Sequence, residues 1–324
     1  MNIGTEQNLQ LPGTAELVAD VLHGLAKPQK SLPCKWFYDE KGAVLFEEIT
    51  LTPEYYLSRT ETKLLHTLSP ELPGLLPELD VVIEPGSGSS VKTRILLESL
   101  PQLERYAPLD ISEEMLLDAA QQLDQDFPAL EVTPYLHDFS TLAPLSLGLE
   151  QNQGCMVFFP GSTIGNFAPA AAGNLLQSFN RLVNHDGWLL IGVDTTHDKD
   201  RLLAAYNDEA GITAQFNKNI LARINRELNS DFDIEQFEHK AVFNEAESRM
   251  EMHLVSLRSQ SVEIDGHEFQ FEAQETIHTE NCYKYSLSRF ESMANNCGWK
   301  VHHVWADNAG TGFKDILLRS LNEL

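Results

Sequence analysis

The sequence predicts an open, mostly parallel α/β sheet that carries a second, inserted lobe. Between residues 81 and 194, short apolar runs alternate with helical patterns, as they do in chains built from β-then-α units with short connections. The run Cys155–Phe159 is apolar throughout, which is typical of a central parallel strand buried on both faces. After residue 196 the pattern changes to polar helices, and residues 248–275 then alternate in the manner of antiparallel strands.

The individual elements follow from the same periodicities. Helical spacing of apolar residues predicts helices over 14–27, 60–68, 94–100 and 286–296, and a helix-rich region over 196–230. Apolar runs predict strands over 81–83, 105–110, 132–137, 155–159, 187–194, 298–305 and 313–318. The dipeptide Asp265-Gly266 marks a turn within the alternating region.

The first predicted strand ends in a glycine-rich turn, E-P-G-S-G-S-S-V-K-T, at residues 84–93. Glycines without a Cβ let a ligand lie against the backbone, and the free N–H groups of a helix starting at Ser89 or Ser90 would face it. Val91 stands where the dinucleotide fingerprint needs its third glycine. This disfavours NAD or FAD and favours a single-nucleoside ligand such as S-adenosyl-L-methionine (AdoMet). An ordinary glycine-rich turn without a ligand is the alternative.

Other polar and aromatic residues follow the next strands. Asp110 ends the second strand at about the distance from Gly86 at which a doubly wound fold places the carboxylate that binds a ribose diol. A helix-capping or solvent-exposed acid is the alternative. Asp138 and Phe139 end the third strand, where they could accept from an adenine amine and stack on its ring. Gly161 lies in a second loop of the ligand-binding type, so the sequence predicts one ligand edge that carries all these residues.

Aromatic residues are unusually dense between residues 36 and 56, in what reads as loops and short helices. Aromatics outside a regular periodic element are candidates for the wall of a ligand pocket. The alternative, for Trp36, Phe37 and Tyr55, is a small aromatic core that packs this segment onto the main body.

Composition narrows the class of partner. The chain has 324 residues, 42% of them hydrophobic, and a formal net charge of −25 with no basic cluster to offset it. Such a surface repels phosphate backbones and anionic lipids, so we expect a small-molecule substrate, with no nucleic acid and no membrane as partner.

The four cysteines are scattered without C-x-x-C spacing, and the N-terminus has no apolar leader pattern. These features predict a cytoplasmic protein with reduced thiols and no zinc site. The histidines, including His278, His302 and His303, show no metal-ligand spacing, so no metal is expected and these residues read as surface or structural.

Several long motifs occur in a recognisable order. They are F-Y-D-E-K-G-A-V-L-F-E-E-I-T-L-T-P-E-Y-Y at 37–56, the glycine-rich turn at 84–93, L-D-I-S at 109–112, F-P-G-S-T-I-G-N-F at 159–167 and I-H-T-E at 277–280. With these motifs, nearly the whole chain resembles the L-histidine Nα-methyltransferases of ergothioneine biosynthesis, AdoMet enzymes that convert histidine to its trimethyl betaine, hercynine.

The resemblance implies a Rossmann-like class I methyltransferase fold with a doubly wound sheet and an inserted α+β substrate-binding lobe. We expect residues 61–195 plus 287–324 to form the AdoMet-binding domain. Residues 1–60 plus 196–286 are expected to form the substrate-binding lobe, which would cover the pocket.

The resemblance also assigns site residues. The positions that correspond to AdoMet contacts are Tyr56, Gly86, Gly88, Lys92, Asp110, Asp138 and Phe139. The positions that correspond to contacts with the amino acid are Phe46, Tyr56, Gly161, Asn166, Tyr206, Met252, Glu280 and Cys282. Asn166 and Tyr206 would bind the α-carboxylate and amine. Tyr38 would lie near the methyl-accepting nitrogen, as the catalytic residue.

Glu280 is the natural reader of an imidazole, because a carboxylate accepts a charge-assisted hydrogen bond from a ring N–H. A substrate without that N–H would leave the carboxylate desolvated and alone. The family has Ser two residues after this glutamate, whereas this chain has Cys282. Because a thiol is a weaker hydrogen-bonding group than a hydroxyl, the second contact to the ring is expected to be weakened, unless Cys282 is a tolerated near-isostere.

These inferences predict an AdoMet-dependent methyltransferase that acts repeatedly on the α-amine of histidine, as a monomer. Alternatives are an enzyme of the same fold that methylates another amino acid or small amine, and an AdoMet-binding protein without turnover. An enclosed pocket makes a protein substrate less favoured.

Overall fold

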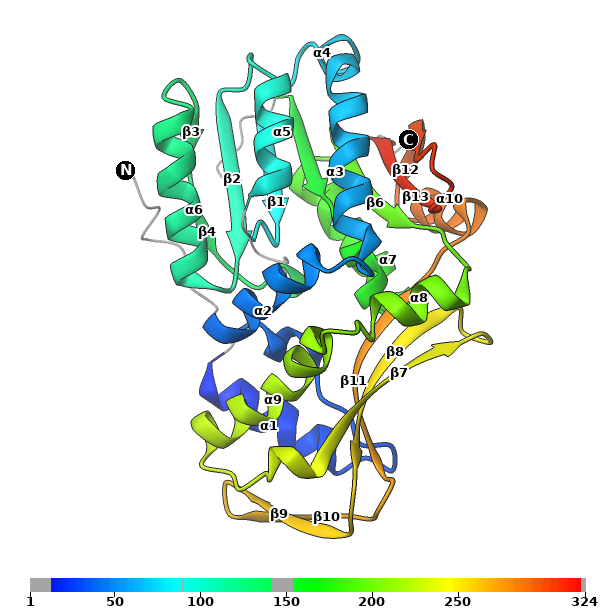
Figure 1. Cartoon of the computed structure of the whole chain (residues 1–324). Helices are drawn as coiled ribbons and strands as arrows, with labels where there is room; N and C mark the ends of the chain where they lie inside the picture. The colour runs from blue at the N-terminus through cyan, green and yellow to red at the C-terminus, as the bar shows by residue number, and fades with distance from the viewer. Residues whose placement is uncertain (1–12, 89, 142–153, 322–324) are drawn as a thin grey trace. The chain divides into compact units, whose positions relative to one another are not determined.

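The computed structural model describes residues 13–88, 90–141 and 154–321, and the chain divides into two compact units (Figure 1). Of the described residues, unit 1 contains those in 57–196 and 284–321, and unit 2 contains 13–56 and 197–283. Each unit has its own sheet, so each is described separately.

Unit 1 is built on a mixed, mainly parallel sheet. Its strands are β1 (Val81–Pro85), β2 (Arg105–Asp110), β3 (Glu131–Val132), β4 (Tyr135–Leu136), β5 (Cys155–Phe159), β6 (Trp188–Asp194), β12 (Trp299–Ala306) and β13 (Phe313–Ser320). The strand order is β12-β13-β6-β5-β1-β2-β3, with β4 also paired to β2. Strand β13 runs antiparallel to both its neighbours. The central strands β1 and β5 are buried along their whole length, as their apolar runs predict.

Helices cover both faces of this sheet. They are α3 (Tyr56–Leu68), α4 (Leu72–Leu75), α5 (Val91–Ser99), α6 (Glu113–Asp126), α7 (Pro169–Leu182) and α10 (Leu287–Asn296), with 3₁₀ turns at Ser69–Glu71, Phe139–Thr141 and Thr163–Asn166. Helices α3, α5 and α6 lie on one face, and α7 and α10 lie on the other (Figure 1). The predicted doubly wound α/β sheet is therefore confirmed, and its order is that of a class I AdoMet methyltransferase fold.

One predicted strand of unit 1 is wrong as a continuous element. The sequence predicts a strand over 132–137, but the structure has two short strands, β3 and β4, each paired with β2. Pro134 lies between them. Because proline has no N–H to donate to the ladder, the strand is interrupted there.

A buried ion pair joins two distant parts of unit 1. The Lys284 ammonium lies 2.8 Å from the Asp194 carboxylate, and both side chains are 0% exposed. Asp194 ends β6, and Lys284 is the residue at which the chain re-enters unit 1. The segment that belongs to unit 2 therefore leaves and returns next to one ion pair.

Unit 2 combines helices with antiparallel strands. Its elements are α1 (Thr14–Leu25), α2 (Glu40–Leu51), α8 (Lys199–Ala205), α9 (Ile212–Leu228), β7 (Phe237–Asn244), β8 (Arg249–Ser256), β9 (Gln260–Ile264), β10 (His267–Phe271) and β11 (Thr276–Tyr283), with 3₁₀ turns at Cys34–Phe37 and Ile234–Gln236. The sheet order is β11-β8-β7, and β9 and β10 form a separate hairpin. Asp265 and Gly266 both have positive φ, as a tight hairpin turn requires. The alternating pattern predicts β8, β9 and β10 but leaves out β7 and β11.

The aromatic segment of unit 2 packs against α9. The rings of Phe37 and Phe216 are 4.7 Å apart, and Trp36 is buried. Next to them, the Asp39 carboxylate accepts a hydrogen bond of 2.7 Å from the Asn219 amide. For Trp36 and Phe37, the structure therefore supports the small aromatic core rather than a ligand wall.

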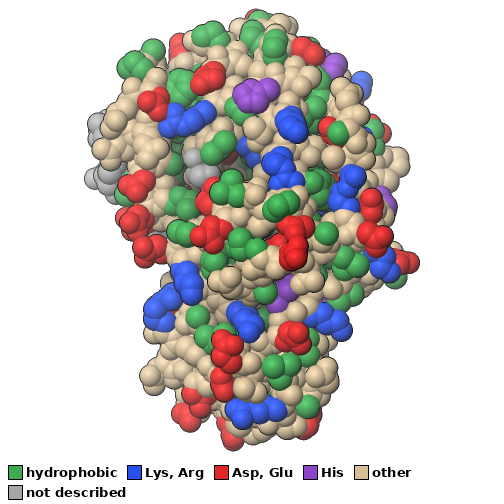
Figure 2. Space-filling view, viewed as in Figure 1, with side chains coloured by type: hydrophobic (Ala, Val, Ile, Leu, Met, Phe, Trp, Pro, Cys, Tyr) green, Lys and Arg blue, Asp and Glu red, His purple; other side chains and the backbone are tan. Residues whose placement is uncertain are grey.

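Charge is distributed rather than gathered into patches on the face shown in Figure 2, where basic side chains lie among more numerous acidic ones. In the described part of the chain, every helix is too short or too polar to cross a membrane.

Candidate functional site

The glycine-rich turn of unit 1 contacts two of the predicted cofactor residues. Gly86 and Gly88 adopt φ of +73° and +51°, which favours glycine at both positions. A Cβ at Gly86 would lie 3.1 Å from the Phe139 ring, and the Gly88 N–H donates to the Asp110 carboxylate over 3.1 Å. The turn, the end of β2 and the 3₁₀ turn at Phe139 therefore come together at one edge of the sheet. Residue Ser89, one of the two predicted helix starts, lies outside the described residues, and α5 begins after Ser90.

Asp110 accepts from the backbone on both sides. Its second oxygen accepts from the Ser112 N–H over 3.0 Å. Ser112 is itself the N-cap residue of α6, so Asp110 closes the turn ahead of the helix and does not cap it. Burial raises the pKa of Asp110, and the bonds from the Ser112 and Gly88 N–H groups oppose that rise. Each carboxylate oxygen accepts more than one hydrogen bond, so the predicted ribose contact is compatible with this geometry.

Glu84, the last acid before the turn, is almost fully buried in β1. Its carboxylate accepts from the Tyr106 hydroxyl over 2.6 Å and from the Thr93 hydroxyl over 2.7 Å. Burial raises the pKa of Glu84 to about 8, although these hydrogen bonds act in the opposite direction. The buried carboxyl therefore keeps its proton in neutral solution.

This protonation predicts how stability changes with pH. The ordinary pKa is 4.5 and the folded pKa about 8, so between these values the folded state binds more protons than the unfolded state. The stabilisation is complete below the unfolded pKa and is lost as the pH rises through the folded one. Glu84→Gln removes this dependence. In urea unfolding, the free energy of unfolding of the variant should rise relative to that of the wild type by up to about 1.4 kcal/mol per pH unit between about pH 6 and 8. A difference that stays constant over this range would contradict the assignment.

Lys92 and Gly161 meet at a carboxylate that the sequence did not single out. The Lys92 ammonium pairs with Glu61 of α3, whose side chain is 0% exposed. The Gly161 N–H donates to both oxygens of the same carboxylate over 2.8 Å. Glu61 therefore fixes two predicted site residues relative to each other.

Two further residues complete the surroundings of Glu61. A Cβ at Gly192 of β6 would lie 2.1 Å from the Glu61 carboxylate, so only glycine leaves room for it there. Asp315 of β13 is buried, and burial together with the Glu61 charge raises its pKa well above the usual range. These contacts join residues far apart in sequence, so no local pattern identifies Glu61 as part of the site.

The other predicted residues of unit 1 lie in short turns. Asp138 accepts from the Ser140 N–H over 2.8 Å and from its hydroxyl over 2.6 Å. Asn166 ends the 3₁₀ turn that follows Gly161.

The remaining predicted substrate residues belong to unit 2. Tyr38 packs edge-on against Phe46 at 5.7 Å and against Phe216 at 5.6 Å, and Phe46 also contacts Tyr55 at 6.2 Å. These rings form an aromatic cluster around the predicted catalytic tyrosine. Tyr56, the last residue of the first segment of this unit, has the guanidinium of Arg201 5.6 Å from its ring centre.

Tyr206 lies with Cys282 and Glu280. Burial raises the pKa of Tyr206 well above its usual value. The charge of Cys282, a hydrogen bond with its side chain and the charge of Glu280 raise this pKa further. Burial also raises the pKa of the nearby Cys34 thiol to about 12, and the Glu280 charge is the second-largest cause of this rise. Met252 is directly opposite Glu280 in the β8–β11 ladder. Four of the predicted substrate residues are thus brought together, and Cys34 is a neighbour that the sequence did not indicate.

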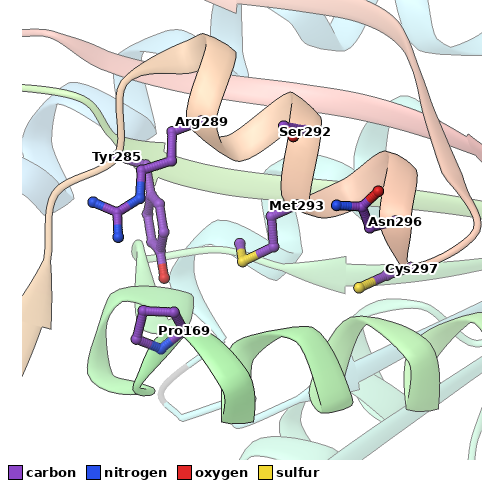
Figure 3. A pocket seen from close by; sticks show the side chains of 7 residues that line it. All are labelled: Pro169, Tyr285, Arg289, Ser292, Met293, Asn296 and Cys297. Atoms are coloured by element: carbon purple, nitrogen blue, oxygen red, sulfur yellow. The ribbon is translucent and has the colours of Figure 1, made fainter.

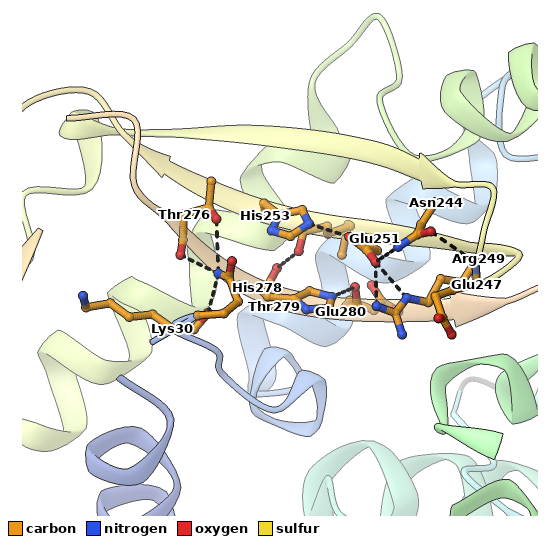
Figure 4. Close-up of polar contacts among 12 residues, drawn as sticks. Lys30, Asn244, Glu247, Arg249, Glu251, His253, Thr276, His278, Thr279 and Glu280 are labelled. Carbon is orange, nitrogen blue, oxygen red and sulfur yellow. Dashed lines mark hydrogen bonds and ion pairs between the residues drawn. The ribbon is translucent and has the colours of Figure 1, made fainter. Parts of the chain in front are cut away.

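A second cluster on these strands contains three potential metal ligands, Glu251, His253 and His278 (Figure 4). The Glu251 carboxylate already accepts from Asn244 and Arg249. The two imidazole rings are stacked 4.7 Å apart with an interplanar angle of 21°. A ring nitrogen coordinates a metal ion that lies in the plane of its ring, so two stacked rings cannot both coordinate one ion. Hydrogen bonds from Asn244, His253 and Arg249 outweigh burial and lower the pKa of Glu251 to about 2, which fits an ion pair with Arg249.

A cavity of about 400 Å³ lies between α7 and α10 in unit 1 (Figure 3). Its lining residues are Pro169, Tyr285, Arg289, Ser292, Met293, Asn296 and Cys297. None of the predicted site residues is among them.

Comparison with known proteins agrees with the fold and the motifs. Residues 17–320 match the family described as "Histidine-specific methyltransferase, SAM-dependent". The chain is 38% identical to the histidine N-alpha-methyltransferase of Mycolicibacterium smegmatis over 96% of its own length and 97% of that protein's. It is 37% identical to the protein of the same name from Mycobacterium tuberculosis, over 92% and 93% of the two lengths. It is also 33% identical to ergothioneine biosynthesis protein 1 of Schizosaccharomyces pombe, over 79% of this chain and 34% of that protein. The resemblance inferred from the motifs is thereby confirmed, and the chain belongs to the histidine-specific, AdoMet-dependent methyltransferase family.

Proposed function

We propose that this enzyme transfers methyl groups from AdoMet to the α-amino group of L-histidine in successive steps, and that the product is the trimethyl betaine, hercynine. The observation that carries the proposal is the grouping of Glu280, Cys282 and Tyr206 in unit 2, together with the family match over nearly the whole chain.

AdoMet, when bound, supplies a methyl group on an electrophilic sulfonium. The residues proposed to hold it are those of the glycine-rich turn with Lys92, Asp110, Asp138, Phe139 and Tyr56. In-line transfer needs a neutral amine aligned with the methyl carbon, so the protein contributes mainly orientation and exclusion of water. We propose that Asn166 and Tyr206 hold the α-carboxylate and amine, with Gly161 in the pocket wall.

Tyr38 is proposed as the orienting group or proton relay at the methyl-accepting nitrogen, because the α-ammonium must lose a proton before each transfer. Its position among Phe46 and Phe216 supports this role. Aromatic walls attract a cation without requiring N–H donors, and they can therefore still hold the amine as its methyl groups accumulate.

Glu280 is proposed to read the imidazole N–H, with Met252 and Phe46 framing the ring. Cys282 stands where the family has serine, and its interaction with Tyr206 gives it a place in the same site. This difference from the family keeps a second function in view, which is methylation of another amino acid or small amine by the same machinery.

The test is to incubate the purified protein with AdoMet and each standard amino acid, and to identify the products by mass. We expect histidine to gain methyl groups, up to three, and the other amino acids to remain unmodified. Methylation of a different amino acid with none of histidine would favour the second function. No methylation of any substrate would favour an AdoMet-binding protein without turnover.

We propose further that the enzyme acts as a monomer in the cytoplasm. All four cysteines are free, which suits a reducing compartment. The net charge of −25 opposes self-association.

A further inference from the structure

We propose that Thr279, through a buried hydrogen-bonded chain with Asn217 and His239, is a positioning residue that sets the enzyme's recognition of the substrate side chain. The inference rests on the proposed function, because it concerns how Glu280 and Tyr206 are held for histidine.

Strand β11 carries one extra residue at Thr279. His278 is opposite His253 on β8, but Glu280 is opposite Met252, so Thr279 and Glu280 together occupy one step of the partner strand. This two-against-one arrangement is a β-bulge, a feature that re-aims the side chains that follow it.

The bulge decides which side of the sheet Glu280 faces. Side chains directly opposite in a ladder share a face, and successive residues alternate. With the bulge, Glu280 and Cys282 share the face of Met252 and Met250. A regular strand would instead place Glu280 opposite Glu251. It would then lie on the other face, among the imidazoles and carboxylate shown in Figure 4.

A hydrogen-bonded chain holds the bulge in place. Thr279 is 1% exposed. Its hydroxyl lies 2.6 Å from the Asn217 side-chain oxygen and 3.0 Å from the Met252 carbonyl oxygen. The Asn217 amide nitrogen donates to the His253 carbonyl over 3.0 Å and to His239 Nδ1 over 2.8 Å. Asn217 of helix α9 is therefore hydrogen-bonded both to the bulge and to the strand opposite it.

The chain continues to Tyr206. Because His239 Nδ1 accepts from Asn217, the proton lies on Nε2, which donates to the Tyr206 carbonyl over 2.9 Å. Burial lowers the pKa of His239, which favours this neutral form. Every side-chain group of the chain then has a partner, and the amide of Asn217 cannot be reversed without setting its oxygen against the His253 carbonyl. One set of bonds therefore fixes both residues proposed to bind the substrate.

The test is Thr279→Val, which keeps the shape and removes the donor, leaving the Asn217 oxygen buried and unpaired. We expect kcat/KM for histidine to fall about 10- to 100-fold, mostly through KM. AdoMet binding by calorimetry should stay within about twofold, because its proposed site lies almost wholly in unit 1. Thr279→Ser keeps the hydroxyl and should restore most of the activity. If T279V does not fold, Thr279→Cys, which keeps a weak donor, replaces it with an intermediate loss expected.

A double-mutant cycle separates positioning from general destabilisation. If Thr279 acts through Glu280, T279V should have little further effect on histidine turnover in the E280A background, so the two losses should be strongly non-additive. Full additivity, or wild-type kcat/KM in T279V, would overturn the inference. The wild-type enzyme is assayed in parallel. If it fails to methylate histidine, the proposed function is overturned, whereas an active wild type with an unimpaired T279V overturns only the role of Thr279.

Discussion

Glu280→Ala is expected to lower kcat/KM for histidine by about 100-fold, the loss that follows removal of a charge-assisted hydrogen bond. The change should also weaken selectivity. In the wild type, a substrate without a ring N–H gives the Glu280 carboxylate no donor from the ligand, whereas the alanine variant has no carboxylate that needs one. Competition between histidine and phenylalanine, with products read by mass, measures both effects.

Two controls accompany this variant. Glu238→Ala removes an exposed carboxylate from β7 of the same unit and should leave turnover unchanged. AdoMet affinity should be the same in the wild type and both variants. Discrimination against phenylalanine that survives in E280A would remove Glu280 from its proposed role.

Lys284→Met should cost about 3–5 kcal/mol of unfolding free energy, because it leaves the Asp194 carboxylate buried without its counter-charge. Both side chains are 0% exposed, so water cannot take the place of the lysine. Urea unfolding followed by tryptophan fluorescence measures the loss.

The double variant Lys284→Met with Asp194→Asn should recover part of this stability, because it removes the buried carboxylate charge that Lys284 no longer balances. Lys199 provides a matched comparison, since it pairs with Glu245 while 53% exposed. Lys199→Met should change stability by less than about 1 kcal/mol. A loss in K284M no larger than in K199M would show that the buried pair has no special importance.

Much of unit 1 could be predicted because its signals are local. A few consecutive residues were enough to predict the buried strand at Cys155–Phe159, which is apolar throughout, and the turn after β1, which contains two glycines. Pro134 offered a local signal as well, and it marks the break between β3 and β4. Unit 2 was harder to predict. In β7, the positions where an alternating pattern needs large apolar residues hold His239 and Ala241, so the pattern does not predict a strand. In β11, the bulge interrupts the alternation.

The site divides in the same way. The motifs pointed to Glu280 and the glycine-rich turn, and the family resemblance added Tyr206, as residues proposed to carry the chemistry. Glu61 and Asn217 could not be found from the sequence, because their roles depend on partners such as Gly161 and Thr279 that lie far away along the chain. A buried acid in a helix looks like any surface acid until its contacts are known.

The place of β13 in the sheet has a consequence for the order of folding. This strand lies between β12 and β6. One edge of β6 therefore stays unpaired until β13 has been synthesised, which happens only after the whole of unit 2. Contacts between residues so distant in sequence are slow to form, and domains tend to fold as they emerge during synthesis. Unit 2, although inserted, is therefore expected to be complete while the nascent sheet of unit 1 still exposes an unpaired edge.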